Sequence, residues 1–273
     1  MSWTALRITP DANRDGVIAA LFASGSQGIV EDGHSLVTHF PPDAELEEIR
    51  NGVLSADPRA TVVMTSAPNT DYSHWRARVS AHRIGDITLS PPWLAAELDP
   101  ATTVVIDPAM AFGTGEHATT QSVVLLMQNV VREGDVVADL GAGSAVLSIA
   151  AAKLGAARVA AIELDHDAIG NAEENVEVNG VAENVSIIEG DAGLLLPLVA
   201  PVGLVLANII SSILLELLPA IHSAVVPGGH AILSGILLDE RSMMVDAIQR
   251  DPWRIVSEDT EDGWWSVLIE RQR

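Results

Sequence analysis

The stretch that decides the fold is "VVADLGAGSAVLSIAAAK", Val136–Lys153. An apolar, strand-like run ends at Asp139, a glycine pair follows at Gly141 and Gly143, and a run with helical periodicity comes next. A strand, a glycine turn and a helix in this order are typical of sheets that bind their ligand beyond the carboxyl ends of the strands. The stretch therefore predicts an α/β fold with a ligand site at this turn.

The same alternation extends along most of the chain. From Thr102 onward, strand-like runs alternate with helical ones, which predicts a mostly parallel, Rossmann-like sheet with helices on both faces. The last two runs, "WRIVSED" and "WWSVLIE", have no helix between them and predict an antiparallel hairpin. A long uncharged stretch, Ala192–Leu215, raises the question of a membrane span. Prolines and polar residues interrupt it, so we interpret it as a buried strand followed by a helix.

The front of the chain has a different pattern, with elements in the order β-α-β-β-α-β. Leu6 and Ile8 share one face of the first strand, and Asp32-Gly33 predicts a tight turn between two strands. This order is the ferredoxin-like arrangement. We therefore predict a small ferredoxin-like α/β domain over residues 1–68, a connector over 69–99 and the Rossmann-like domain over 100–273.

Composition excludes several classes of protein. The chain has 273 residues, 48% of them apolar, which is ample for a packed core. There is no cysteine, so disulfides and thiolate zinc sites are excluded. A formal net charge of −22 disfavours direct non-specific binding of nucleic acid and favours a basic protein partner. No signal peptide is visible at the start, and we expect a cytoplasmic protein with no membrane contact.

The glycine turn also indicates the class of cofactor. A dinucleotide site requires a third glycine, and Val146 stands in that position here. An S-adenosylmethionine site requires an acid followed by Gly-x-Gly, which "DLGAGSA" provides. Asp139 then suits the ammonium group of the cofactor, while Gly141 and Gly143 let the backbone approach the nucleoside.

Acids end the next two strands as well. Glu163, 22 residues after Gly141, is placed to accept hydrogen bonds from ribose hydroxyls. Asp191 follows the third strand and is predicted to lie near the adenine edge. Glycines alone turn many tight corners, but acids and glycines at the ends of three successive strands favour S-adenosylmethionine.

Asn208, at the end of the fourth strand, is the candidate catalytic residue. Methyl transfer to nitrogen needs a neutral amine with a free lone pair, and an asparagine can hold such an amine in line without titrating. An alternative interpretation is that Asn208 caps the following helix.

Several motifs together resemble one known family, the PrmA methyltransferases of large-subunit ribosomal protein eleven. "IDPAMAFGTGEHATT", residues 106–120, is similar to the family's signature. The glycine stretch, "ENVEVNGV", "LANII" and the C-terminal "GWWSVLIER" are similar to further family segments. The small front domain matches the family's substrate-recognition domain in size and position. The resemblance therefore covers nearly the whole chain.

The resemblance implies trimethylation of lysine and N-terminal amines on the ribosomal protein, with S-adenosylmethionine as cofactor. It implies cofactor contacts from Thr120, Gly141, Glu163 and Asn208. The signature then closes over the methionine end of the cofactor, with Phe112 shielding it. The chain departs from the family in its glycine turn, where the family usually has cysteine and glycine in place of Ala142 and Ala145, and in Glu163, where aspartate is common.

Alternatives to this function remain open from the sequence. They are a methyltransferase of another protein or small molecule, a non-catalytic cofactor-binding ribosome adaptor and, more distantly, a dehydrogenase. Glu116 and His117 lack the clustered ligands that a metal site needs, so we predict no metal and expect His117 to order its loop. Strand alternation places one ring of the Trp264-Trp265 pair in the core and one outside it.

Overall fold

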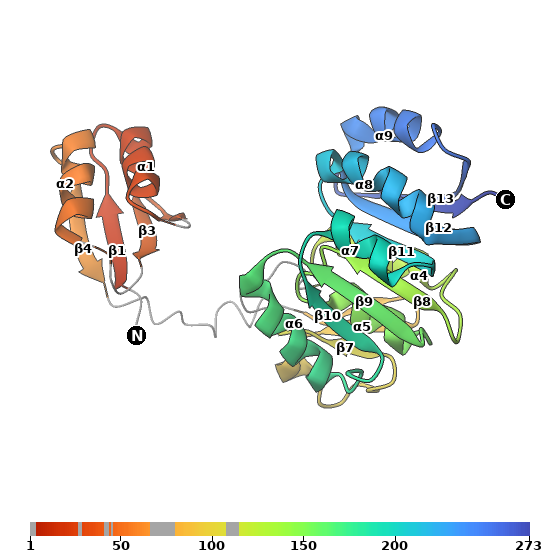
Figure 1. Cartoon of the computed structure of the whole chain (residues 1–273). Helices are drawn as coiled ribbons and strands as arrows, with labels where there is room; N and C mark the ends of the chain where they lie inside the picture. Colours follow the sequence, from red (N-terminus) through yellow and green to blue (C-terminus); the bar gives the residue numbers. More distant parts are fainter. Residues whose placement is uncertain (1–3, 27–28, 41–43, 45, 66–79, 108–114) are drawn as a thin grey trace. The chain divides into compact units, whose positions relative to one another are not determined.

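The computed structural model describes residues 4–26, 29–40, 44, 46–65, 80–107 and 115–273. The chain divides into two compact units, Met1–Arg78 and Val79–Arg273, which we describe separately as unit 1 and unit 2 (Figure 1). Residues 80–99 lie within the predicted connector, and by their contacts they belong to unit 2. The predicted limits of the two domains and the connector stay a prediction.

Unit 1 has the β-α-β-β-α-β order predicted from its sequence. Its elements are β1 (Thr4–Thr9), α1 (Arg14–Ala23), β2 (Ile29–Asp32), β3 (Ser35–Phe40), α2 (Leu46–Ala56) and β4 (Thr61–Thr65). The strands form an antiparallel sheet in the order β2-β3-β1-β4. Leu6 and Ile8 point from β1 into one core with residues of both helices, because alternate strand residues face the same side. The predicted ferredoxin-like domain is confirmed.

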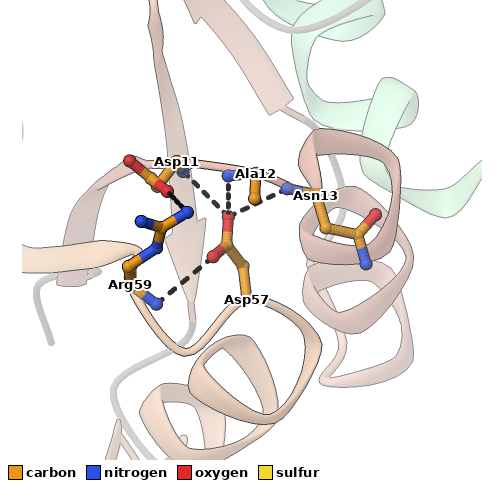
Figure 2. A network of polar contacts seen from close by, with 5 residues as sticks. All are labelled: Asp11, Ala12, Asn13, Asp57 and Arg59. Carbon is orange, nitrogen blue, oxygen red and sulfur yellow. Dashed lines mark hydrogen bonds and ion pairs between the residues drawn. The ribbon is translucent and has the colours of Figure 1, made fainter.

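A buried carboxylate, Asp57, ties the end of α2 to the β1–α1 loop (Figure 2). Its side chain is 1% exposed, and its Oδ2 accepts hydrogen bonds from the backbone N–H groups of Asp11, Ala12 and Asn13 at 2.8, 2.8 and 3.0 Å. Its Oδ1 accepts a fourth from the N–H of Arg59 at 3.2 Å. These backbone donors, that of Asn13 most of all, lower the pKa of Asp57 to about 2.

Unit 2 is built on a sheet of seven strands (Figure 1). These are β8 (Val136–Leu140), β9 (Arg158–Glu163), β10 (Val185–Glu189), β11 (Val202–Asn208), β12 (Val225–Leu237), β13 (Trp253–Glu261) and β14 (Trp264–Arg271). They lie in the order β10-β9-β8-β11-β12-β14-β13. Only β14 runs antiparallel to its neighbours, β12 and β13, so the predicted C-terminal hairpin is confirmed. β8 and β11 are adjacent, and the order of strands reverses between them.

Helices cover both faces of this sheet and enclose two separate apolar cores. One core contains residues of α4 (Ala118–Met127), α5 (Val146–Lys153) and α6 (His166–Val178). The other contains residues of α7 (Ala192–Val199), α8 (Ser211–Ala224) and α9 (Arg241–Ile248), which follows the short 3-10 turn η2 (Leu238–Glu240). Strand alternation explains the division, because Val137 of β8 faces the first core and Ala138 and Leu140 face the second.

Two elements of unit 2 differ from the sequence prediction. The strand predicted at 102–107 exists as β7 (Thr103–Val105), but it pairs in parallel with β6 (Ile87–Ser90) in a small sheet that also contains β5 (His82–Ile84). The short 3-10 turn η1 (Pro92–Leu94) connects β6 toward β7. The stretch from Ala192 begins with a helix, α7, rather than with a strand. Among the described residues, no helix combines the length and apolar character that a membrane crossing needs.

Candidate active site

A pocket of about 780 Å³ opens at the carboxyl ends of the parallel strands in unit 2. Gly141 follows β8, Leu164 follows β9, Asp191 lies after β10 and Asn208 ends β11, and all four line the pocket. The other lining residues are His117, Thr119, Ile162, Glu163, Gly190, Ala192, Gly193, Ile209, Ile210, Ile213, Glu216, Leu217, Gly235 and Trp264. The pocket thus lies where ligands bind in open α/β sheets, beside the point where the strand order reverses.

The glycine turn between β8 and α5 has a backbone that few other residues would adopt. Gly141 and Gly143 have φ angles of +72° and +52°. The N–H groups of Gly141 and Ala142 donate to the carbonyl of Ile162 at 2.9 and 3.1 Å, which fixes the turn to the end of β9. A Cβ atom on Gly141 would lie 2.5 Å from Cγ2 of Ile209, so a side chain there would displace the wall of the pocket.

The two acids predicted at strand ends, Glu163 and Asp191, both lie in the pocket wall, and both accept hydrogen bonds from backbone N–H groups. Glu163 accepts from the N–H of Gly143 through Oε2 and from the N–H of Asp165 through Oε1, each at 2.7 Å. Asp191 caps α7 and accepts from the N–H of Leu194 at 3.0 Å. Glu163 therefore ties the glycine turn to the end of β9, while Asp191 fixes the start of a helix that sequence reasoning missed.

Asp139 lies behind the wall rather than in it. Its side chain is fully buried, and Oδ2 accepts from the hydroxyl of Ser148 on α5 at 2.7 Å. Oδ1 is buried with no hydrogen-bond partner among the described residues. Burial raises the pKa of Asp139 to about 6, although hydrogen bonding by Ser148 acts against that rise. Asp139, Gly143 and Thr120 are not lining residues, and their predicted roles toward the cofactor stay predictions.

The side chain of Asn208 contacts a residue of α4. Its Nδ2 lies 3.5 Å from Oγ1 of Thr120, a fully buried side chain near the start of that helix. The residue that caps α8 is Ile210, so the alternative interpretation of Asn208 as a helix cap is wrong. Asn208 instead combines a place in the pocket wall with a contact to the signature threonine.

His117, Trp264 and Glu216 are among the pocket residues that were not predicted as site residues. His117 caps α4 by accepting from the N–H of Thr119, as its predicted ordering role suggests, and its ring also meets that of Trp264 edge-on at 5.2 Å. Strand alternation predicted that one ring of the Trp264-Trp265 pair lies outside the core. Trp265 is the fully buried one, so the ring outside is that of Trp264. Glu216 on α8 lines the pocket without any local sequence signal. Phe112 lies outside the described residues.

The pocket wall has three carboxylates, Glu163, Asp191 and Glu216, and its described lining contains no lysine or arginine. Such a wall attracts a cation and repels the pyrophosphate of a dinucleotide. S-adenosylmethionine has a sulfonium, an ammonium and ribose hydroxyls that donate hydrogen bonds, so the set of charged residues fits it. Apolar residues such as Leu164 and Ile213 offer surface for an adenine ring. Within the described ranges, no cluster of three or more His, Asp or Glu side chains can hold a metal ion.

Comparison with known proteins agrees with this geometry. The model of the family "Ribosomal protein L11 methyltransferase (PrmA)" matches residues 9–272, nearly the whole chain. The chain belongs to this family. A PrmA methyltransferase uses S-adenosylmethionine to methylate ribosomal protein L11, and the predicted family, fold, cofactor and enzyme class are therefore confirmed.

Individual PrmA relatives align over most of their length. The ribosomal protein L11 methyltransferase of Exiguobacterium sibiricum is 35% identical over 219 residues, covering 78% of this chain and 68% of that protein. The one from Geobacter metallireducens is 35% identical over 245 residues, covering 85% and 79%. The crystal structure of the ribosomal protein L11 methylase from Lactobacillus delbrueckii subsp. bulgaricus is 28% identical with a TM-score of 0.65, and the alignment covers 71% of this chain and all of that one.

Proposed function

We propose that the pocket of unit 2 is where this chain methylates amine nitrogens of ribosomal protein L11, with Asn208 as the catalytic residue. The observation that carries the proposal is the position of Asn208, in the pocket wall at the end of β11 and in contact with Thr120. We further propose that Glu163 and Asp191 bind the cofactor together with the backbone at Gly141.

The chemistry assigns a definite task to Asn208. S-adenosylmethionine supplies an electrophilic methyl group, and the acceptor nitrogen must present a lone pair to it. A lysine with a pKa of about 10.4 must first lose a proton, and a terminal amine near 8 does so more easily. The contact of Nδ2 with Thr120 orients the carboxamide, so that Oδ1 can accept from an N–H of the neutral amine. Asn208 would thus hold the neutral amine with its lone pair free, and the carboxamide itself does not titrate.

Charge supports a basic protein as the partner. The chain has a formal net charge of −22, and three carboxylates surround the pocket. This distribution attracts a lysine-rich acceptor and repels the phosphates of RNA, so we expect recognition of the free protein rather than of nucleic acid. We expect the reaction to take place in the cytoplasm, where ribosomal proteins are made.

Transfer of a labelled methyl group to purified L11 tests the proposal. We expect Asn208→Ala to lower kcat at least about 100-fold, because the acceptor is no longer held in line. The KM for S-adenosylmethionine should stay within roughly threefold if Asn208 acts mainly on the acceptor. Asn129→Ala, an exposed asparagine just after α4, is the control and should behave like the unsubstituted chain.

Two results would contradict the proposal. If Asn208→Ala kept kcat within about threefold of the unsubstituted chain, the catalytic role of Asn208 would be wrong. If the unsubstituted chain transferred methyl groups to another protein of the ribosome but not to L11, the acceptor would be wrong while the site could stand.

A further inference from the structure

One buried asparagine joins the segment just after β7 to the glycine turn. Asn175 lies on α6 and is 3% exposed. Its Oδ1 accepts from the N–H of Asp107, just after β7, at 3.0 Å. Its Nδ2 donates to the carbonyl oxygen of Ser144, in the glycine turn, at 3.0 Å. A single carboxamide thus links segments that lie 68 and 31 residues away in the chain.

The two partners fix the orientation of this carboxamide. Asp107 offers only a donor there and Ser144 only an acceptor, so the amide oxygen and nitrogen cannot exchange places. Nδ2 also lies 3.4 Å from Oδ1 of Asn171, one turn earlier on the helix. Both functional ends of Asn175 are therefore engaged in a buried environment, where a lost hydrogen bond leaves a polar group unsatisfied.

Ser144 is the residue of the glycine turn whose carbonyl oxygen accepts from Asn175. It is 1% exposed and stands between Gly143, whose N–H donates to Glu163, and Ala145, which has a left-handed φ of +64°. The end of β9 holds one side of the turn through Glu163 and Ile162. Asn175 holds the other side. A shift of Ser144 would therefore move Gly143 against Glu163, which lines the pocket.

Asn179, one turn further along the chain, provides an internal comparison. Its Oδ1 accepts from the N–H of Val105 at 2.8 Å, and its Nδ2 donates to the carbonyl of the same residue at 2.6 Å. Asn179 thus binds the same end of β7 as Asn175 does. Its Nδ2 also donates to the carbonyl oxygen of Asn175 at 2.8 Å, but its hydrogen bonds among the described residues do not extend to the glycine turn.

We propose that Asn175 is a positioning residue of the methyl-transfer site, which sets the glycine turn, and through it Glu163, in the geometry that binds the cofactor. This proposal rests on the proposed function, in which the pocket holds S-adenosylmethionine. Asn175 acts through Ser144 and Gly143 and does not itself line the pocket.

The substitution Asn175→Asp isolates the connection. Aspartate has the same shape and still accepts from Asp107, but its carboxylate cannot donate to Ser144 and faces that carbonyl with a second acceptor. We expect the Kd for S-adenosylhomocysteine, measured by calorimetry without L11, to rise about tenfold or more. The KM for S-adenosylmethionine should rise in parallel, while kcat at saturating cofactor stays within about threefold.

Asn179→Asp is the matched control, since it makes the same chemical change one turn later on the same segment. Both substitutions should lower the melting temperature, but Asn179→Asp should leave the Kd within about twofold of the unsubstituted chain. Hydrogen exchange gives a second readout: amides of residues 141–145 should exchange faster with Asn175→Asp and not with Asn179→Asp. If Asn175→Asp is unfolded at the assay temperature, Asn175→Ser, which also removes Nδ2, replaces it with the same expectation.

Two outcomes would overturn the proposal. One is a Kd within about twofold of the unsubstituted chain for a folded Asn175 variant, and the other is an equal rise in Kd for Asn179→Asp. If the unsubstituted chain binds S-adenosylhomocysteine but does not methylate L11, the proposed acceptor is wrong, and the binding comparison still decides the role of Asn175. If it does not bind S-adenosylhomocysteine, both proposals fail.

Discussion

Each of the two units of this chain buries an aspartate, and the pKa values of the two carboxyl groups shift in opposite directions. In unit 1, Asp57 accepts four backbone N–H groups, and its pKa falls to about 2 (Figure 2). In unit 2, Asp139 accepts from one hydroxyl, one oxygen has no partner among the described residues, and burial raises its pKa to about 6. At Asp57 the backbone donors outweigh desolvation and lower the pKa, whereas at Asp139 desolvation outweighs the hydrogen bonding of Ser148 and raises it.

This difference indicates what each aspartate does for its unit. Asp57 stabilises unit 1, because its ionised form satisfies the backbone donors of the β1–α1 loop. Asp139 opposes the folding of unit 2 at neutral pH, where its charge is buried beneath the glycine turn. The non-glycine residues with positive φ in the described ranges, Ala145 and Asp262, also both lie in unit 2. Of these, Asp139 and Ala145 belong to the glycine turn and the strand that precedes it, next to the pocket.

Substitution of Asp57 should give the largest effect. Asp57→Asn replaces an oxygen by an NH2 group, which faces backbone donors, and we expect the melting temperature of unit 1 to fall by roughly 10 °C or more. Because the folded pKa lies below the unfolded one, this stabilisation is present above about pH 4 and is lost as the pH falls toward 2. The rate of hydrogen exchange at the amides of residues 11–13 measures this stabilisation. If these amides exchanged as slowly in Asp57→Asn as in the unsubstituted chain, Asp57 would not stabilise unit 1 in this way.

Asp139→Asn should reveal the opposite dependence on pH. The folded pKa is raised, so the carboxyl favours folding at low pH, and this contribution disappears as the pH rises through about 6. Between pH 5 and pH 8 the free energy of unfolding should therefore fall roughly 1 kcal/mol further in the unsubstituted chain than in Asp139→Asn. Urea unfolding at both pH values measures the difference, and equal pH dependence would refute the raised pKa.

Ala145→Gly tests whether the turn of unit 2 is strained. Glycine adopts a φ of +64° without a steric penalty, so we expect the free energy of unfolding to rise by up to about 1 kcal/mol. Ala152→Gly, inside α5, should instead lower it by roughly 0.5–1 kcal/mol, because glycine weakens a helix. A loss of stability in both variants would show that the turn tolerates alanine.

The smallest effect is expected at the ion pair beside Asp57. Arg59 and Asp11 lie 2.6 Å apart, but their side chains are 75% and 45% exposed. We expect Arg59→Ala to change the free energy of unfolding by less than about 0.5 kcal/mol, since exposed pairs contribute little and the backbone N–H of Arg59 remains. Urea unfolding measures the change. A larger loss would mean that side-chain charge, and not only the backbone donors to Asp57, stabilises this part of unit 1.

Much of the fold and part of the site follow from local sequence patterns. Apolar alternation predicted the strands, and the lack of a helix between the last two predicted their hairpin. The polar residues and glycines at strand ends predicted a ligand site, and Gly141, Glu163, Asp191 and Asn208 lie in the wall of the pocket. These residues share one wall because the carboxyl ends of parallel strands meet at one edge of a sheet, so order along the chain becomes proximity in space.

Other features depend on contacts that no local pattern records. The sequence by itself determined the class of fold, the family and the strand ends that form the pocket. Only the tertiary structure decided that β7 pairs outside the large sheet, that Glu216 reaches the pocket and that Asp139 lies behind its wall. It also decided that Asn175 joins Asp107 to Ser144. Periodicity fixes which face a side chain takes, but its hydrogen-bond partners come from distant segments that only packing brings within reach.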